Sequence, residues 1–73
     1  MEEVRNVLAK TFRVKASDIT DATTVEDIDT WDSLTHMEMV ANLESELGIE
    51  FDGDEIAEMI NVSKIEEIVK AKK

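Results

Sequence analysis

The chain of 73 residues is long enough for one small domain, and a domain of this size buries only about 60% of its unfolded surface, which leaves little room for a catalytic cleft. It contains no cysteine and one histidine, which excludes disulfides, cysteine-ligated zinc, a cysteine nucleophile and most histidine-based metal or triad sites. The formal net charge is −10, and because residues 16–63 contain no lysine or arginine, this stretch would repel nucleic acids and anionic membranes.

An all-α fold is indicated by the many helix-forming residues, the absence of proline and the presence of only two glycines. The first helix is predicted over residues 2–13, where apolar side chains recur at helical spacing. Its core-facing residues are expected to be Val4, Val7, Leu8 and Phe12.

Residues 14–32 lose the helical period and are predicted to form a long loop that isolated apolar residues anchor to the core. These anchors are expected to be Val14, Ile19, Val25, Ile28 and Trp31. Thr24 and Asp27 are spaced to cap a single helical turn within the loop. We interpret Trp31 as a core anchor rather than a contact for cargo, because a buried aromatic ring removes a large apolar area from water.

The second helix is predicted to begin at Asp32 or Ser33 and to end near Gly48, because aspartate favours the N-cap and glycine favours the C-terminal end. Its core stripe is expected to consist of Met39, Val40, Leu43 and Leu47. His36 falls within the same arc. We interpret it as a histidine satisfied by the backbone or by the preceding loop, without a ligand or catalytic role.

The same helix carries a second apolar stripe. Leu34, Met37 and Ala41 align away from the core, with Glu38 and Glu44 on either flank. Such a patch offers desolvation at its centre and electrostatic steering at its rim, and methionine adapts to partners of different shape. The stripe therefore indicates a docking surface for basic proteins, although scattered apolar residues are also ordinary on protein surfaces.

Two more helices are predicted in the C-terminal third. Ile49 and Phe51 alternate with acidic residues and should fill part of the core. A short helix should follow, with the apolar residues Ile56, Met59 and Ile60. Ser63 and Glu66 form a capping-box pattern that predicts the start of the last helix. The inward residues of that helix should be Ile65, Ile68 and Val69, and its C-terminal lysines Lys70, Lys72 and Lys73.

The run Asp32-Ser33-Leu34 follows an acidic loop, opens an acidic amphipathic helix and resembles the signature of acyl carrier proteins and their thiolation-domain relatives. The resemblance covers nearly the whole chain, including Leu43-Glu44 and Gly48-Ile49. It implies that coenzyme A donates a covalent 4'-phosphopantetheine to Ser33 and that the thiol of this arm carries acyl groups as thioesters. Unpaired amides in the first helical turn would favour the added phosphodiester. The protein would then be a phosphoprotein and a carrier, not an enzyme.

The resemblance also implies a set of partners. These would be a phosphopantetheinyl transferase and acyl-processing enzymes, such as ketosynthases or acyltransferases, which present basic surfaces. The residues that would meet them are Asp32, Leu34, Met37, Glu38, Ala41 and Glu44. A further hypothesis from the family is that growing acyl chains fold back between the helices into an adaptable apolar pocket lined by Met39, Leu43, Leu47, Met59 and Ile60, and whether the chain is sequestered in the core stays open.

The predicted molecule is a small four-helix bundle of three longer helices and one short helix, with a long first loop, forming a single carrier domain over residues 1–73. We expect a cytoplasmic monomer without membrane insertion, because no apolar run reaches roughly 20 residues and the start, Met1-Glu2-Glu3, does not resemble a signal peptide.

Several alternatives stay open at this point. Fatty-acid, polyketide, aminoacyl and specialised lipid pathways all remain possible, and Trp31-Asp32-Ser33-Leu34-Thr35-His36 looks like the run found in some discrete, specialised carriers. An acidic helical interaction domain with an unmodified Ser33 is a second interpretation. A calcium-binding loop is not favoured, because the spacing of the acidic residues does not match an EF-hand.

Overall fold

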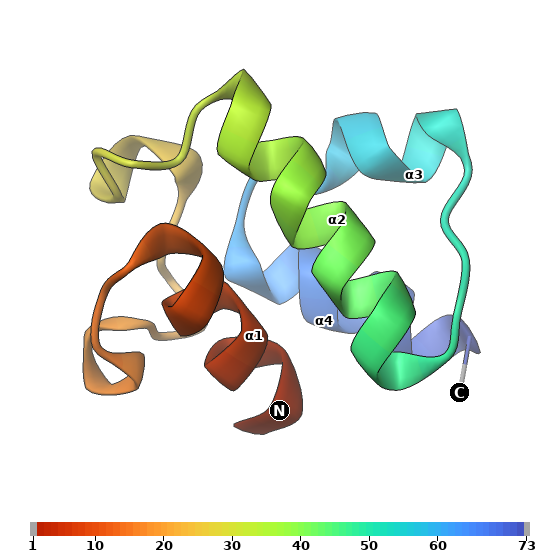
Figure 1. Cartoon of the computed structure of the whole chain (residues 1–73), viewed down its shortest axis with the longest axis horizontal. Helices are drawn as coiled ribbons and strands as arrows, with labels where there is room; N and C mark the ends of the chain where they lie inside the picture. The colour runs from red at the N-terminus through yellow and green to blue at the C-terminus, as the bar shows by residue number, and fades with distance from the viewer. Residues whose placement is uncertain (1, 73) are drawn as a thin grey trace.

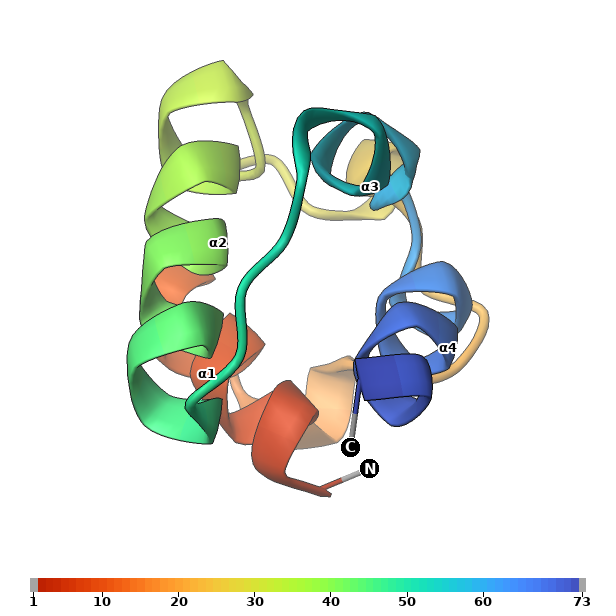
Figure 2. The same cartoon turned by 90° about the vertical axis from the view of Figure 1, so that its right-hand side faces the viewer.

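The computed structural model describes residues 2–72. Within this range it contains four α-helices and two 3-10 turns, in the order α1 (Glu2–Phe12), η1 (Ala16–Asp18), η2 (Val25–Asp27), α2 (Ser33–Leu47), α3 (Gly53–Glu58) and α4 (Val62–Lys72). Figures 1 and 2 show the helices arranged around one core. The predicted all-α bundle of three longer helices and one short helix is confirmed. Among residues 2–72, no helix is long and apolar enough to cross a membrane.

One face of each longer helix contributes to the core, and α1 packs directly against α2. The fully buried side chains include Val4, Leu8, Phe12, Met39, Leu43, Met59, Val62, Ile65 and Val69. Leu47 and Ile49 are only half buried and pack against the edge of the core. The apolar spacing therefore predicted the inward face of every longer helix correctly.

The long loop between α1 and α2 is held at several points. Ile19, Ile28 and Trp31 are buried in the core, as predicted, and Thr24 forms the expected reciprocal cap of η2. The backbone of Thr24 also pairs with that of Asn61 in an antiparallel bridge. This bridge joins the loop to the connection between α3 and α4.

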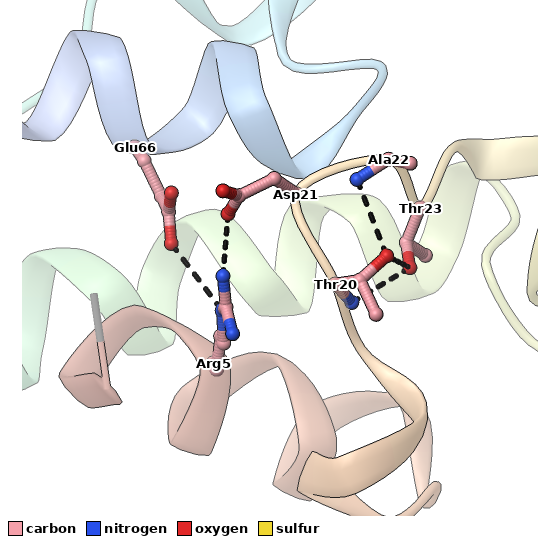
Figure 3. A network of polar contacts seen from close by, with 6 residues as sticks. All are labelled: Arg5, Thr20, Asp21, Ala22, Thr23 and Glu66. Atoms are coloured by element: carbon pink, nitrogen blue, oxygen red, sulfur yellow. Dashed lines mark hydrogen bonds and ion pairs between the residues drawn. The ribbon is translucent and has the colours of Figure 1, made fainter.

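Arg5 of α1 links the loop to α4 (Figure 3). Its guanidinium is bonded to Asp21 of the loop, and its Nε lies 3.5 Å from Oε2 of Glu66, whose side chain is nearly buried. The hydrogen bond from Arg5 is the main reason why the pKa of Asp21 lies below its usual value of 3.8. Three segments that are distant in sequence are thus joined by one cation.

The start of α4 differs from the prediction. α4 begins at Val62, and Oδ1 of Asn61 accepts the Lys64 amide at 2.7 Å, so Asn61 rather than Ser63 caps the helix. Glu66 is not a capping-box partner, because its carboxylate is buried in the ion-pair network of Figure 3. The earlier start places Val62 in the core, where it is fully buried.

The end of α3 also differs from the prediction. The helix stops at Glu58, so Met59 and Ile60 lie beyond it, and the Ile60 side chain is 56% exposed. The Ile60 carbonyl accepts the amide of Val25 at 3.0 Å, which commits this backbone to the bridge with the loop. Lys73, expected at the end of the last helix, lies outside the described residues.

Two of the helices end at a residue with left-handed backbone geometry. α1 stops at Phe12, one residue earlier than predicted, because Arg13 has φ 61 and the amide of Val14 turns back to the Ala9 carbonyl at 3.1 Å. α2 ends at Gly48, where φ is 67 and where glycine is the residue that adopts this geometry most easily.

Replacing Gly48 by alanine should lower the free energy of unfolding by about 1 kcal/mol, because alanine is strained at a left-handed φ. An added Cβ meets nothing within 4 Å at Gly48 or at Gly53, and Gly53 has no positive φ. Gly53→Ala is therefore the matched control, with stability unchanged or slightly raised. Urea unfolding followed by circular dichroism measures both variants, and equal midpoints would contradict this explanation.

Candidate functional site

The start of α2 is fixed by a reciprocal cap between Asp32 and Thr35. Oδ1 of Asp32 accepts the amides of Leu34 at 3.0 Å and Thr35 at 2.9 Å, and Oγ1 of Thr35 accepts the Asp32 amide at 2.9 Å. The hydrogen bond from the Thr35 amide is the largest of several that hold the pKa of Asp32 below its usual value of 3.8. Asp32 is therefore the N-cap, and Ser33 is the first helical residue.

The Ser33 side chain is exposed at this first position of α2. Because Asp32 provides the cap, the Ser33 hydroxyl has no capping role, and within residues 2–72 it has no hydrogen-bond partner. A bulky group attached to this oxygen therefore fits without breaking a contact of the fold.

The amides of the first turn are less available than the sequence analysis assumed. The backbone amides of Leu34 and Thr35 already donate to the carboxylate of Asp32, which lies one residue before the helix. An anion attached to Ser33 would have to compete with this cap. The expectation that the first-turn amides are unpaired is therefore wrong for two of them.

Trp31 anchors the residue next to the cap. Its side chain is 5% exposed and stacks on Phe12, with ring centroids 4.8 Å apart. Its indole Nε1–H donates to Nδ1 of His36 at 3.0 Å, and Nε2 of His36 lies 2.8 Å from the Ile56 carbonyl oxygen of α3. Two predictions are thus confirmed. Trp31 anchors the loop to the core, and the ring nitrogens of His36 are bonded to a loop residue and to a backbone carbonyl.

An apolar groove opens beside Ser33, between the start of α2 and α3. Its volume is about 490 Å³, which is within the usual range for small-molecule sites. Its apolar lining consists of Val25, Trp31, Met37, Ile56, Ala57 and Ile60. Figures 1 and 2 both place α3 at the same end of the bundle as the first turns of α2. No local pattern in the sequence indicates this groove, because its walls come from segments that only tertiary contacts bring together.

The residues predicted to contact partners do not all have the same surroundings. Those that are exposed are Asp32, Leu34, Met37, Glu38 and Ala41. Leu34 is 71% exposed and Met37 is 50% exposed, so the outer stripe of α2 leaves two large apolar side chains in solvent close to Ser33. Glu44 is half buried, and its Oε2 accepts the Phe51 amide at 2.9 Å, so it also holds the segment that follows α2.

Among residues 2–72, no three acidic or histidine side chains are grouped to hold a metal ion.

The residues expected to line an internal acyl pocket are not brought to one surface. Met39, Leu43 and Met59 are fully buried, whereas Ile60 is 56% exposed. The Ile60 carbonyl is bonded to the Val25 amide beside the bridge to the loop. The surface groove next to Ser33 is a separate apolar space, lined by Ile60 but not by the three buried residues.

Comparison with known proteins gives a consistent result. The family model described as the phosphopantetheine attachment site matches residues 2–69. Among solved structures, the chain is similar to the solution structure of a holo acyl carrier protein from Geobacter metallireducens. The two chains share 30% sequence identity with a TM-score of 0.86, over 96% of this chain and 80% of the other. None of the curated proteins matches the chain.

Replacing Asp32 by alanine should destabilise the fold near neutral pH, because the amides of Leu34 and Thr35 lose their acceptor, whereas Asp32→Asn should retain most of the cap. The folded-state pKa of Asp32 is lowered, so the ionised cap contributes fully above about pH 3.8 and its contribution is lost as the pH falls through the folded-state value. Urea midpoints of both variants and of the wild type, measured from pH 7 into this acid range, provide the check. A wild-type advantage over Asp32→Ala that stays constant into strong acid would contradict the assignment.

Proposed function

The chain belongs to the acyl carrier protein family of phosphopantetheine-attachment domains, and from this membership we propose that it carries acyl groups as thioesters on an arm attached to Ser33. The family match confirms the expected cofactor, 4'-phosphopantetheine. This group supplies a thiol, which the chain itself lacks because it has no cysteine. The observation that carries the proposal is an exposed Ser33 hydroxyl at the start of α2, on the rim of an apolar groove and without a hydrogen-bond partner among the described residues 2–72.

Loading requires that the oxygen of Ser33 lose its proton and bond to the phosphorus next to the pantetheine of coenzyme A, while the pyrophosphate linkage breaks and adenosine 3',5'-bisphosphate leaves. The carboxylate of Asp32, the residue next to Ser33 in the chain, is a poor base for this proton, because hydrogen bonds from the backbone lower its pKa and occupy Oδ1. The transferase must therefore supply the base, and the carrier supplies an accessible acceptor in a fixed position. This division of roles agrees with a family whose members are generally carriers rather than enzymes.

The exposed side of α2 is the proposed docking surface for the transferase and for acyl-processing enzymes. Leu34 and Met37 provide apolar contact area close to Ser33, and Glu38 adds negative charge beside them. Residues 16–63 contain no lysine or arginine, so the field around α2 attracts basic surfaces. Ketosynthases and acyltransferases with such surfaces are the expected partners.

We propose that residues 1–73 form one carrier domain that acts as a cytoplasmic monomer. The strongly negative net charge supports a monomer, because copies of the chain repel one another. The pathway can be a fatty-acid, polyketide or specialised lipid pathway, since the attachment site is common to all of them.

Incubation with coenzyme A and a broad-specificity phosphopantetheinyl transferase should increase the intact mass of the protein by one phosphopantetheine. Ser33→Ala should show no increase, because the acceptor oxygen is missing. Ser63→Ala is the matched control, since Ser63 is also an exposed serine in the first turn of a helix, and this variant should be loaded fully. Folded wild type that starts unmodified and gains no mass would leave an acidic helical interaction domain as the better interpretation.

Changing the docking surface should slow loading without unfolding the carrier. Met37→Ala and Glu38→Lys should each reduce kcat/KM of the transferase by about tenfold, as expected when an interface contact worth more than 1 kcal/mol is lost. Asp18→Lys makes the same change in charge on η1 and should have little effect. Rates measured at several salt concentrations test the electrostatic part, and equal losses for Glu38→Lys and Asp18→Lys would contradict a specific surface.

A further inference from the structure

We propose that His36 limits how far an acyl chain carried on Ser33 can enter the molecule, by keeping the chain in the surface groove and out of the core. The inference rests on the proposed carrier function and adds a specificity to it. The chain would favour acyl groups short enough for the groove to cover, and the distal part of a long acyl chain would remain outside the bundle.

The position of His36 is the first reason. His36 lies three residues after Ser33 on α2, so the two side chains lie on neighbouring parts of the helix surface, and both line the groove. Beyond this point lie the core residues Met39, one turn further along α2, and Met59, which directly follows α3. Both methionines are fully buried. An acyl chain that passed between α2 and α3 toward the core would have to pass the imidazole ring.

The hydrogen bonds of His36 are the second reason. An indole N–H can only donate, so Nδ1 of His36 accepts from Trp31 at 3.0 Å, and Nε2–H donates to the Ile56 carbonyl at 2.8 Å. The ring therefore forms a bridge from the loop through α2 to α3, with both of its nitrogens occupied. An entering acyl chain would have to break this bridge and would leave the indole N–H of the buried Trp31 without a partner, which is unfavourable.

The restraint on α3 is the third reason. On its other side, Lys72 of α4 pairs with Glu55 at 2.9 Å and lies over the ring of Phe51, with Nζ 5.8 Å from the ring centroid. The hydrogen bond from the Asp52 amide and then the contact with Lys72 lower the pKa of Glu55, so this carboxylate is ionised at neutral pH. α3 is thus held from both sides, by His36 and by Lys72, and does not move aside freely.

The test uses the methionine methyl groups as probes. The protein is loaded from butanoyl- and dodecanoyl-coenzyme A with the same broad-specificity transferase, intact mass confirms loading, and ¹³C-methyl NMR spectra are compared with those of the holo form. In the wild type, both acyl groups should shift the methyl resonance of Met37 in the groove and leave those of Met39 and Met59 in the core unchanged. The thermal midpoint should not rise with the length of the acyl chain.

In His36→Ala, dodecanoyl should also shift the resonances of Met39 and Met59, and the thermal midpoint should rise from the butanoyl to the dodecanoyl form. Lys72→Ala is the control for a general loosening of α3 and should give smaller core shifts than His36→Ala, because the imidazole ring still lies between the groove and the core. Trp31→Phe keeps an aromatic ring but removes the donor to His36, and it serves as the second variant if His36→Ala does not fold, with the same core shifts expected.

Core shifts in dodecanoyl wild type would overturn the inference while leaving the carrier function intact. Unchanged core resonances in a folded His36→Ala, or core shifts of equal size in Lys72→Ala, would overturn it as well. A protein that accepts no acyl arm at all, as judged by intact mass, would overturn the carrier function together with this inference.

Discussion

The buried indole of Trp31 is the contact on which the site depends, because it joins three parts of the molecule that are otherwise weakly connected. Its ring stacks on Phe12 at the end of α1, and its N–H reaches α3 through His36. The long loop is thereby held at its last residue before the cap of α2. The start of α2 is consequently positioned by the core, even though Ser33 itself is exposed.

The cap of α2 divides two roles between adjacent residues. Asp32 binds the amides of the first turn, and Ser33 is left with a hydroxyl that the fold does not use. A serine at the N-cap would have its oxygen turned back toward the helix amides, and modification there would remove the cap. With aspartate in that role, a large group can be added without weakening the helix that presents it.

Sequence reasoning succeeded where local chemistry decides the structure and failed where tertiary contacts decide it. The cap at Asp32, the C-terminus at Gly48 and the turn capped by Thr24 depend on residues close in sequence, and all three were predicted. The predicted start of α4 at Ser63 was wrong, because the burial of Val62 outweighs the capping pattern at Ser63. The groove beside Ser33 could not be predicted, since it requires the backbone bridge between the loop and the segment after α3.

The separation of charge along the chain becomes a separation in space. The lysine and arginine residues within residues 2–72 lie on α1, in the short segment after it and on α4, whereas α2 and α3 contain none. The charge distribution of the folded molecule is therefore asymmetric, a dipole whose negative side lies toward α2 and α3, although Lys10 and Lys72 pair with Glu46 of α2 and Glu55 of α3. Figure 2 shows where these helices lie. In the field of a basic enzyme, this dipole exerts a torque on the carrier before the two proteins touch. Collisions are biased toward one orientation, which shortens the rotational search that precedes each transfer.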